Sequence, residues 1–230
     1  MPPVKKADPG QITLNRIGRA MARIPIEGTT PLIVNKFSEK AQQIMLARQM
    51  AETLQREPKN PEEMFTNAQH LFGDGSAGFP AVGFKAAIVD AARFFKGSKL
   101  TMTDLRRMFF VNGVPGDEKA NRTLLTPVYG KWTGDVATLV PAEPIMRQDY
   151  TRLATGVADI RFRPEYEPWC AVLEVVYIKS LFKLETVVAL VDAAGMNGIG
   201  EWRPASKESN TGSYGTWRVP DDAGVKEIAL

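Results

Sequence analysis

Apolar and polar residues alternate in several stretches of the chain, and this pattern is typical of strands. Residues 11–26 alternate at isoleucine and leucine positions, and Pro25 argues against a helix there. Residues 32–34 form a short apolar run, and residues 157–163 repeat with a period of two. The run 169–178 is rich in β-branched and aromatic residues, so it predicts a central strand.

Four other segments have the composition or the spacing of helices. Residues 38–55 open with a serine at an N-cap position and continue with good helix formers. Residues 83–95 carry apolar side chains at i, i+3 and i+4. A shorter helix is predicted over 102–110, and an apolar helix over 184–194 ends at Gly195.

The segments between these elements indicate the domain organisation. Residues 1–10 are polar and contain proline, so they predict a disordered arm before a single domain over 11–230. Residues 56–64 read as a charged, mobile linker, and the glycine-rich turn within 65–81 predicts a hairpin. Residues 112–150 are irregular, with short apolar runs and no long helix, so we expect an inserted lobe there.

The order of the predicted elements indicates the fold class. After the last helix, residues 198–203 are a short extended piece and residues 214–219 a final strand. The order strand, helix, strand, strand, helix, strand is the split βαβ, or ferredoxin-like, arrangement. The sequence therefore predicts an α+β protein with a ferredoxin-like (RRM-like) palm. RNA-recognition modules share this arrangement, although a fold alone does not determine function.

The amino-acid composition limits the classes of site and partner that we expect. With 44% hydrophobic and 24% charged residues the chain is ordinary for a globular protein, and no stretch reaches the roughly 20 apolar residues of a membrane span. One cysteine excludes an intrachain disulfide and suggests a reducing, cytoplasmic setting. One histidine and one cysteine argue against structural zinc, so we expect no metal and no cofactor. A net charge of +3 permits a polyanion as partner without requiring one.

The most informative segment is the glycine-rich stretch 198–219. Its glycines allow backbone amides to approach a phosphate, and Arg203 and Lys207 can neutralise the phosphate charge. Three aromatic residues can either stack on a base or pack in the core, and the spacing favours neither role: Trp202, Tyr214 and Trp217.

A second segment, 79–93, joins a strand to a helix. Gly83 lies at the predicted start of the helix and Lys85 in its first turn, where free amide groups attract a phosphate. Taken alone, Lys85 is better explained as a solvated helix residue; Arg93, at the end of the same segment, is a further candidate for phosphate contact.

Other basic positions are also candidates for phosphate contact: Lys36, Arg147, Arg152, Arg161 and Arg163. Arg161 and Arg163 lie two residues apart on a predicted strand, so their side chains share one face. Such a pair suits a phosphate track, although a role in the solubility of an edge strand is nearly as plausible.

Together the segments 79–93 and 198–219 resemble the RAMP superfamily, the repeat-associated fold of CRISPR effector subunits. The resemblance lies in Phe79-Pro80 followed by Phe84-Lys85-Ala86-Ala87, and in Gly198-Ile199-Gly200 followed by Gly212-Ser213-Tyr214-Gly215-Thr216-Trp217. The loop departs from the family pattern in being longer and in containing Glu201 and Glu208. Its GIGEWRP style is also similar to that of proteins carried by phages and prophages.

The resemblance implies a non-catalytic subunit of an antiviral CRISPR effector. It implies a palm with a thumb-like lobe, at about 112–150 in this chain, and head-to-tail assembly into a filament along single-stranded nucleic acid, with RNA favoured. The implied partners are copies of the chain and other effector subunits, with no membrane.

Two alternatives stay open. The chain can be a phage structural or protein-interaction component, or a phage protein that binds single-stranded DNA. A metal-dependent nuclease ranks last, because no paired-carboxylate motif stands out and nothing selects one aspartate among Asp117, Asp135, Asp149 and Asp159.

Overall fold

The computed structural model describes residues 16–37, 39–50, 58–98, 100–117, 123–152, 156–206 and 212–230. The predicted arm 1–10, the expected cap residue Ser38, the predicted helix end 51–55 and the candidate Lys207 lie outside the described residues.

Two long antiparallel strands form the centre of the main sheet. Strand β1 (Arg19–Gly28) pairs with β9 (Cys170–Ile178), from Arg19 opposite Ile178 to Glu27 opposite Cys170. Every second side chain of β1 between residues 20 and 26 is buried, as the alternation in the sequence predicted.

Shorter strands extend this sheet on both sides. Strand β10 (Trp217–Arg218) pairs with β1 and β4 (Phe109–Val111) pairs with β9, both antiparallel, which gives the order β10-β1-β9-β4. Strand β11 (Lys226–Ala229), which the sequence analysis missed, also pairs with β1. At its other end β9 pairs with β6 (Leu124–Tyr129), and β6 pairs with β3 (Gly78–Pro80) and β5 (Val114–Pro115).

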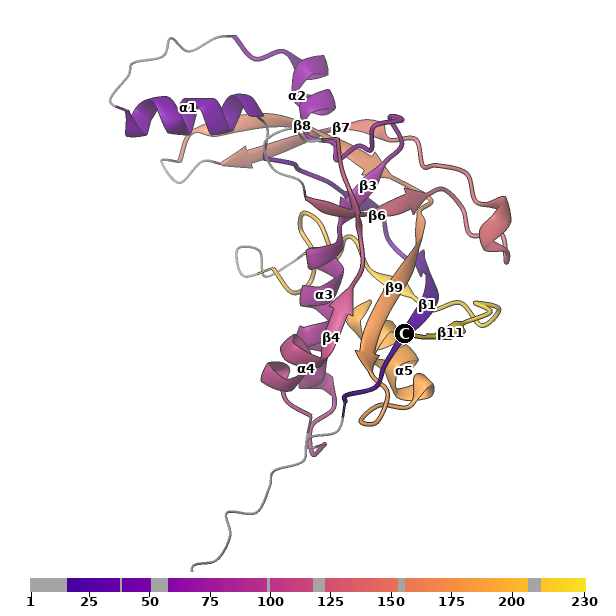
Figure 1. The fold of residues 1–230 in the computed structure, drawn as a ribbon. Coiled ribbons are helices and arrows are strands. Elements are labelled where there is room, and N and C mark those ends of the chain that lie inside the picture. Colours follow the sequence, from indigo (N-terminus) through magenta and orange to yellow (C-terminus); the bar gives the residue numbers. More distant parts are fainter. Residues whose placement is uncertain are drawn as a thin grey trace, which may run out of the picture.

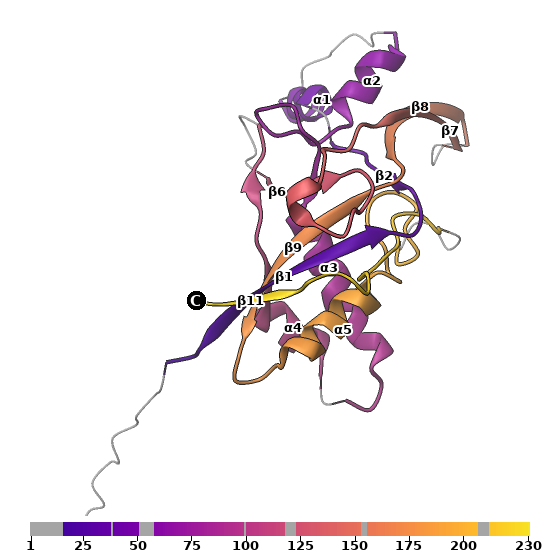
Figure 2. The same cartoon turned by 90° about the vertical axis from the view of Figure 1, so that its right-hand side faces the viewer.

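Three helices pack on one side of this sheet (Figures 1 and 2). They are α3 (Ala81–Asp90), which continues as the 3-10 turn η1 (Ala91–Phe94), α4 (Met102–Met108) and α5 (Leu184–Ala194). The core between helices and sheet includes Phe84 of α3 and Trp217 of β10, whose rings meet edge to face at 5.8 Å. Helix α5 begins and ends as the sequence predicted.

A second, three-stranded sheet lies at the opposite end of the molecule from α4 and α5 (Figure 1). Its order is β2 (Leu32–Ile33), β8 (Ala158–Tyr166), β7 (Ile145–Arg152), again antiparallel. Helices α1 (Glu39–Gln49) and α2 (Pro61–Asn67) lie beside it, and the short turn η2 (Val136–Thr138) precedes β7. Helices together with antiparallel sheets confirm the α+β prediction.

Two local predictions were wrong. The piece predicted as extended over 198–203 is a turn, with Gly198, Gly200 and Trp202 at positive φ. The segment read as a mobile linker over 56–64 contains the start of α2. The Asn60 side chain accepts hydrogen bonds from the amides of Glu62 and Glu63, and Pro61 occupies the first helical position, where its missing N–H costs nothing. The proline that suggested a linker is therefore a helix start.

Candidate nucleic-acid interface

A groove of about 910 Å³ separates α3 from the glycine-rich loop that follows α5. One wall consists of α3 residues, among them Val82 and Gly83 of the first turn. The other wall is the loop from Asn197 to Ser206, and α4 closes one end with Met102 and Arg106. The two segments singled out in the sequence therefore face each other across one groove.

The loop wall needs its glycines for packing. Gly200 has φ +76°, and a Cβ there would lie 2.4 Å from the Ile33 carbonyl oxygen. Gly215 has φ +66°, and a Cβ there would lie 1.9 Å from the Ile199 carbonyl oxygen. Both positions combine a left-handed backbone with close backbone contact, which only glycine tolerates.

The expectation that loop amides bind phosphate needs correction. The Gly198 amide donates to the Gly195 carbonyl, the Ile199 amide to Gly215, and the Glu201 amide to Ile33. These donors hold the loop to α5 and β2 and are not available to a ligand. The N-terminus of α3 is different. Its N-cap residue is Pro80, whose side chain accepts no hydrogen bond from the first-turn amides. Its first-turn amides favour an anion in the groove.

Positive charge dominates the groove. Four basic side chains line it, Lys85, Arg93, Arg106 and Arg203, against two acidic ones, Asp90 and Glu201. Asp90 is neutralised by Arg93 at 2.6 Å.

The other three basic side chains stay available to a ligand. Arg106 and Arg203 form no ion pair with any described residue, and Arg203 is positioned by a hydrogen bond from Nη1 to the Gly200 carbonyl, 2.9 Å. The Lys85 ammonium lies over the Phe110 ring, 4.4 Å from its centroid, and forms no ion pair with any described residue. The groove is therefore suited to a polyanion.

Sequence reasoning found part of this site. Lys85, Arg93 and Arg203 were predicted candidates and meet in the groove. Arg106 was missed. It lies four residues after Met102 on the same face of α4, and only the packing of α4 against α3 directs that face into the groove.

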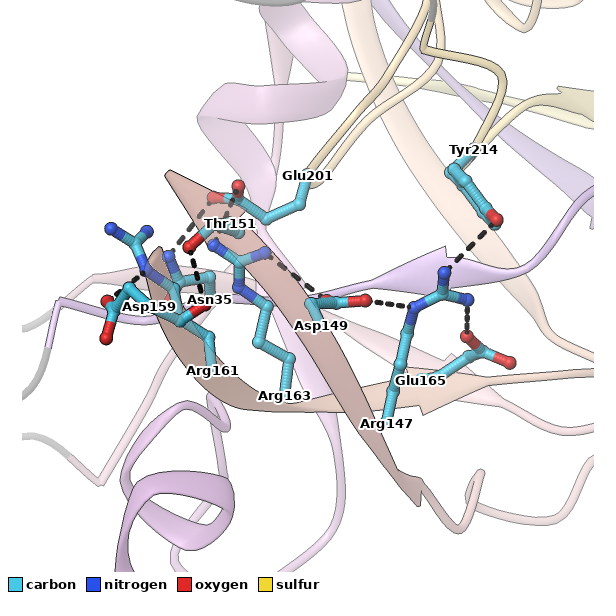
Figure 3. A network of polar contacts seen from close by, with 10 residues as sticks. All are labelled: Asn35, Arg147, Asp149, Thr151, Asp159, Arg161, Arg163, Glu165, Glu201 and Tyr214. Carbon is cyan, nitrogen blue, oxygen red and sulfur yellow. Dashed lines mark hydrogen bonds and ion pairs between the residues drawn. The ribbon is translucent and has the colours of Figure 1, made fainter. Parts of the chain in front are cut away.

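Three of the candidate arginines of β7 and β8 belong instead to a network of polar contacts within the chain (Figure 3): Arg147, Arg161 and Arg163. Arg147 donates to the Asp149 carboxylate at 2.7 Å, to Glu165, and to the Tyr214 hydroxyl at 3.2 Å. Burial by itself would lower the Arg147 pKa, but the hydrogen bonds to Glu165 and Asp149 outweigh it and raise this pKa above its ordinary value. Arg147 thus joins the β7–β8 hairpin to the glycine-rich loop.

Arg163 lies deeper in the same network. It is 2% exposed, and its guanidinium is 3.4 Å from both Asp149 and Glu201. Arg161 shares its face of β8, as predicted, but pairs with Asp159 at 3.4 Å. A phosphate track along these two residues would require breaking ion pairs, because the shared face is turned towards carboxylates and the loop (Figure 3).

The aromatic candidates are also held internally. Trp217 is 3% exposed and donates its indole N–H to the Val191 carbonyl, so it belongs to the core. The ring of Trp202 faces the guanidinium groups of Arg147 and Arg163, at 5.5 and 5.3 Å. Trp202 therefore stacks on arginine in this structure.

The remaining candidates lie away from the groove or outside the description. The Lys36 amide donates to the Ala68 carbonyl and so links the segment after β2 to the end of α2. Arg152 ends β7, and its side chain is outside the described part of the chain, as is Lys207.

The described residues contain neither a cluster of metal-ligating side chains nor a helix able to span a membrane. In the ranges that the structure describes, no group of three or more His, Cys, Asp or Glu residues is arranged to hold a metal ion. Across the same residues, no helix has the length and apolar character needed to cross a membrane.

Comparison with known proteins gives weak matches of fold. No protein-family model matches the sequence, and no curated protein does. The chain is similar to a chain in the structure of Type III-B Cmr-beta bound to cognate target RNA, with 9% identity and a TM-score of 0.47. That match covers 92% of this chain but only 61% of the other, so the chain spans less than two thirds of that protein.

A second match is Cmr6 from Pyrococcus furiosus, with 12% identity and a TM-score of 0.40, over 87% of this chain and 99% of the other. Because both similarities are weak, the functional inference rests on the residues of this chain.

Proposed function

We propose that the chain is a non-catalytic, RAMP-type subunit that binds single-stranded RNA and assembles head-to-tail with copies of itself and with other effector subunits in the cytoplasm. The observation that carries the proposal is the groove between α3 and the glycine-rich loop, where Lys85, Arg106 and Arg203 form no ion pair with any described residue. The two segments that resemble the RAMP motifs form its opposite walls.

The arrangement of the main sheet supports the palm. Strands β1, β4, β9 and β10 with helices α3 and α5 follow the order βαββαβ along the chain, and their order in the sheet is β10-β1-β9-β4. This is a ferredoxin-like arrangement. Of the segment proposed as a thumb-like lobe, about 112–150, β5 and β6 belong to the main sheet, and β7 pairs with β8 in the second sheet.

Phosphate recognition follows from the charges. A single-stranded polynucleotide brings one negative charge per nucleotide, and each contact between a basic side chain and a phosphate releases bound counterions. The groove offers such contacts without an exposed aromatic platform, since Trp217 is buried and Trp202 is covered by arginine. We therefore expect affinity that depends steeply on salt and little on sequence.

Three of the four aspartates considered for catalysis have other roles in the structure. Asp135 caps η2 by accepting from the Ala137 amide, Asp149 holds two arginines, and Asp159 pairs with Lys59. The pKa of Asp159 lies below its ordinary value because of the hydrogen bond from Lys59. These contacts favour a structural use of the carboxylates and support a binding subunit.

The direct experiment is fluorescence anisotropy with labelled 30-mer single-stranded RNA and DNA, on protein freed of nucleic acid at high salt. Arg106→Gln is expected to weaken RNA binding about three- to tenfold, since one charged contact is lost. Arg107→Gln is the matched control, because Arg107 is exposed on the same helix but does not line the groove. Sedimentation of the complexes measures whether their size grows with RNA length.

Tight, salt-sensitive binding with growing complexes supports the proposal. Absence of binding at low salt contradicts it and leaves a structural or protein-interaction component as the better account. Equal losses for Arg106→Gln and Arg107→Gln would show that the groove is not the interface.

A further inference from the structure

We propose that Glu201, held by Asn35, recognises the ribose 2′-hydroxyl and makes the groove selective for RNA over DNA. This inference rests on the proposed function, because it concerns how the same groove discriminates between two nucleic acids. It starts from an anomaly: a carboxylate lines a groove that is otherwise suited to phosphate.

The other carboxylate of the groove, Asp90, does not oppose phosphate binding in the same way. Its partner Arg93 lies three residues along the same helix, so its charge is cancelled locally. Glu201 is fixed instead by two residues from other parts of the chain, Asn35 in the groove wall and Arg163 of β8. One carboxylate oxygen accepts from the Asn35 amide at 3.2 Å, and the other lies 3.4 Å from the buried Arg163 guanidinium. These two partners set the orientation of the carboxylate.

The Glu201 carboxylate can still accept a hydrogen bond from a ligand. Its side chain is 33% exposed, and a carboxylate has about four acceptor sites, of which the two contacts occupy a part. Next to phosphates such a group is unfavourable unless the ligand donates a hydrogen bond to it. A sugar hydroxyl is a donor that recurs at every nucleotide of RNA, and carboxylates use this contact in dinucleotide sites, where they bind a ribose 2′-hydroxyl.

The position of Arg203 favours the sugar over the base. Arg203 lies two residues after Glu201, and its guanidinium is anchored to the Gly200 carbonyl that directly precedes Glu201. Glu201 and Arg203 line the same stretch of groove wall, so a nucleotide whose phosphate contacts Arg203 brings its sugar to this wall, and the sugar, unlike the base, does not change with sequence. DNA has no donor at this sugar position, so its binding brings the carboxylate no hydrogen bond to offset the nearby phosphate charge.

The test compares three 30-mers of one sequence: RNA, DNA and 2′-O-methyl RNA. The methyl group removes the hydrogen-bond donor but keeps the RNA-like sugar. The comparison therefore separates the effect of the hydrogen bond from the effect of the sugar conformation. Wild-type protein is expected to bind RNA about tenfold more tightly than either other oligomer, the loss typical of a hydrogen bond to a charged group.

Two substitutions locate the effect. Glu201→Met removes charge and acceptor at similar volume, and it should reduce the RNA-to-DNA ratio to about one while DNA binding tightens. Glu201→Gln keeps one acceptor oxygen and should retain part of the preference. Glu185→Met is the control, because Glu185 is exposed on α5 outside the groove, and it should leave the ratio unchanged.

The outcomes separate this inference from the proposed function. If no oligomer binds, the proposed function fails. If wild-type protein binds all three equally, or if Glu201→Met keeps the wild-type ratio, only the role of Glu201 is overturned. Should Glu201→Met not fold, the 2′-O-methyl comparison on wild-type protein and the Glu201→Gln variant still decide the matter.

Discussion

Removing Asp149 should destabilise the protein, because this carboxylate is the shared counter-charge of two arginines on neighbouring strands. The Asp149 and Arg163 side chains are each only 3% exposed, and Arg147 donates to the same carboxylate. In Asp149→Leu both guanidinium groups lose a partner. Breaking a buried ion pair from one side costs about 3–5 kcal/mol, because an uncompensated charge stays buried.

The structure places the cost near the lower end of that range. Arg163 keeps Glu201 and Arg147 keeps Glu165, so neither arginine is left without a carboxylate. We expect about 3 kcal/mol for Asp149→Leu, which corresponds to a fall in Tm of about 6–12 °C for a chain of this size. Urea unfolding followed by tryptophan fluorescence measures the free energy of unfolding, and a thermal scan measures Tm.

The same hairpin supplies a matched control. Asp159 pairs with Lys59 and Arg161, whose side chains are 46% and 38% exposed, so Asp159→Leu should cost at most about 1 kcal/mol. Combining Asp149→Leu with Arg163→Met should recover most of the loss, since an apolar pair can replace a buried ion pair. A cost below about 1 kcal/mol for Asp149→Leu, or equal costs at Asp149 and Asp159, would refute the reasoning.

Two further predictions concern the backbone and alkaline pH. Gly215→Ala should lower the free energy of unfolding in urea by at least about 2 kcal/mol, because φ is +66° and the new Cβ meets the Ile199 carbonyl. The control Gly97→Ala, at φ +91° in open space, should lower it by only about 1 kcal/mol. Similar costs at both sites would contradict the close contact at Gly215. Burial, with the charge of Glu27, raises the Cys170 pKa to about 12, and burial raises the Tyr166 pKa to about 12. Both groups release protons at lower pH when unfolded, so stability should hold below about pH 9 and decline as pH rises towards 12, and a flat free energy of unfolding from pH 8 to 11 would contradict this.

The elements that follow local rules were predictable from the sequence. The alternation of apolar and polar residues predicted the buried face of β1, and the apolar run that ends at a glycine predicted α5. Helix α2 was missed because Pro61, read as a helix breaker, occupies the one helical position that tolerates proline. Short edge strands such as β11 have no distinctive pattern, since pairing with β1 defines them.

The site was predictable only where a motif marked it. Glycines and a helix start identified both walls of the groove, but Arg106 reaches it through the packing of α4, which the sequence does not report. The shared face of Arg161 and Arg163 was inferred correctly, yet Arg163 is buried there and Arg161 is paired with Asp159. Its partner Glu201 lies 38 residues beyond Arg163 along the chain, and contacts over such separations follow from tertiary structure.

The salt dependence of RNA binding tests the groove most directly. Each phosphate contact with a single strand contributes about −0.7 to the slope of log affinity against log salt. The triple variant Lys85→Gln, Arg106→Gln, Arg203→Gln should therefore reduce the magnitude of the slope by about 2 relative to wild type. A control variant removes three exposed charges outside the groove by substitution with glutamine: Lys96, Arg107 and Lys183. The account predicts a near wild-type slope for this control, and equal slopes for the two triple variants would contradict it.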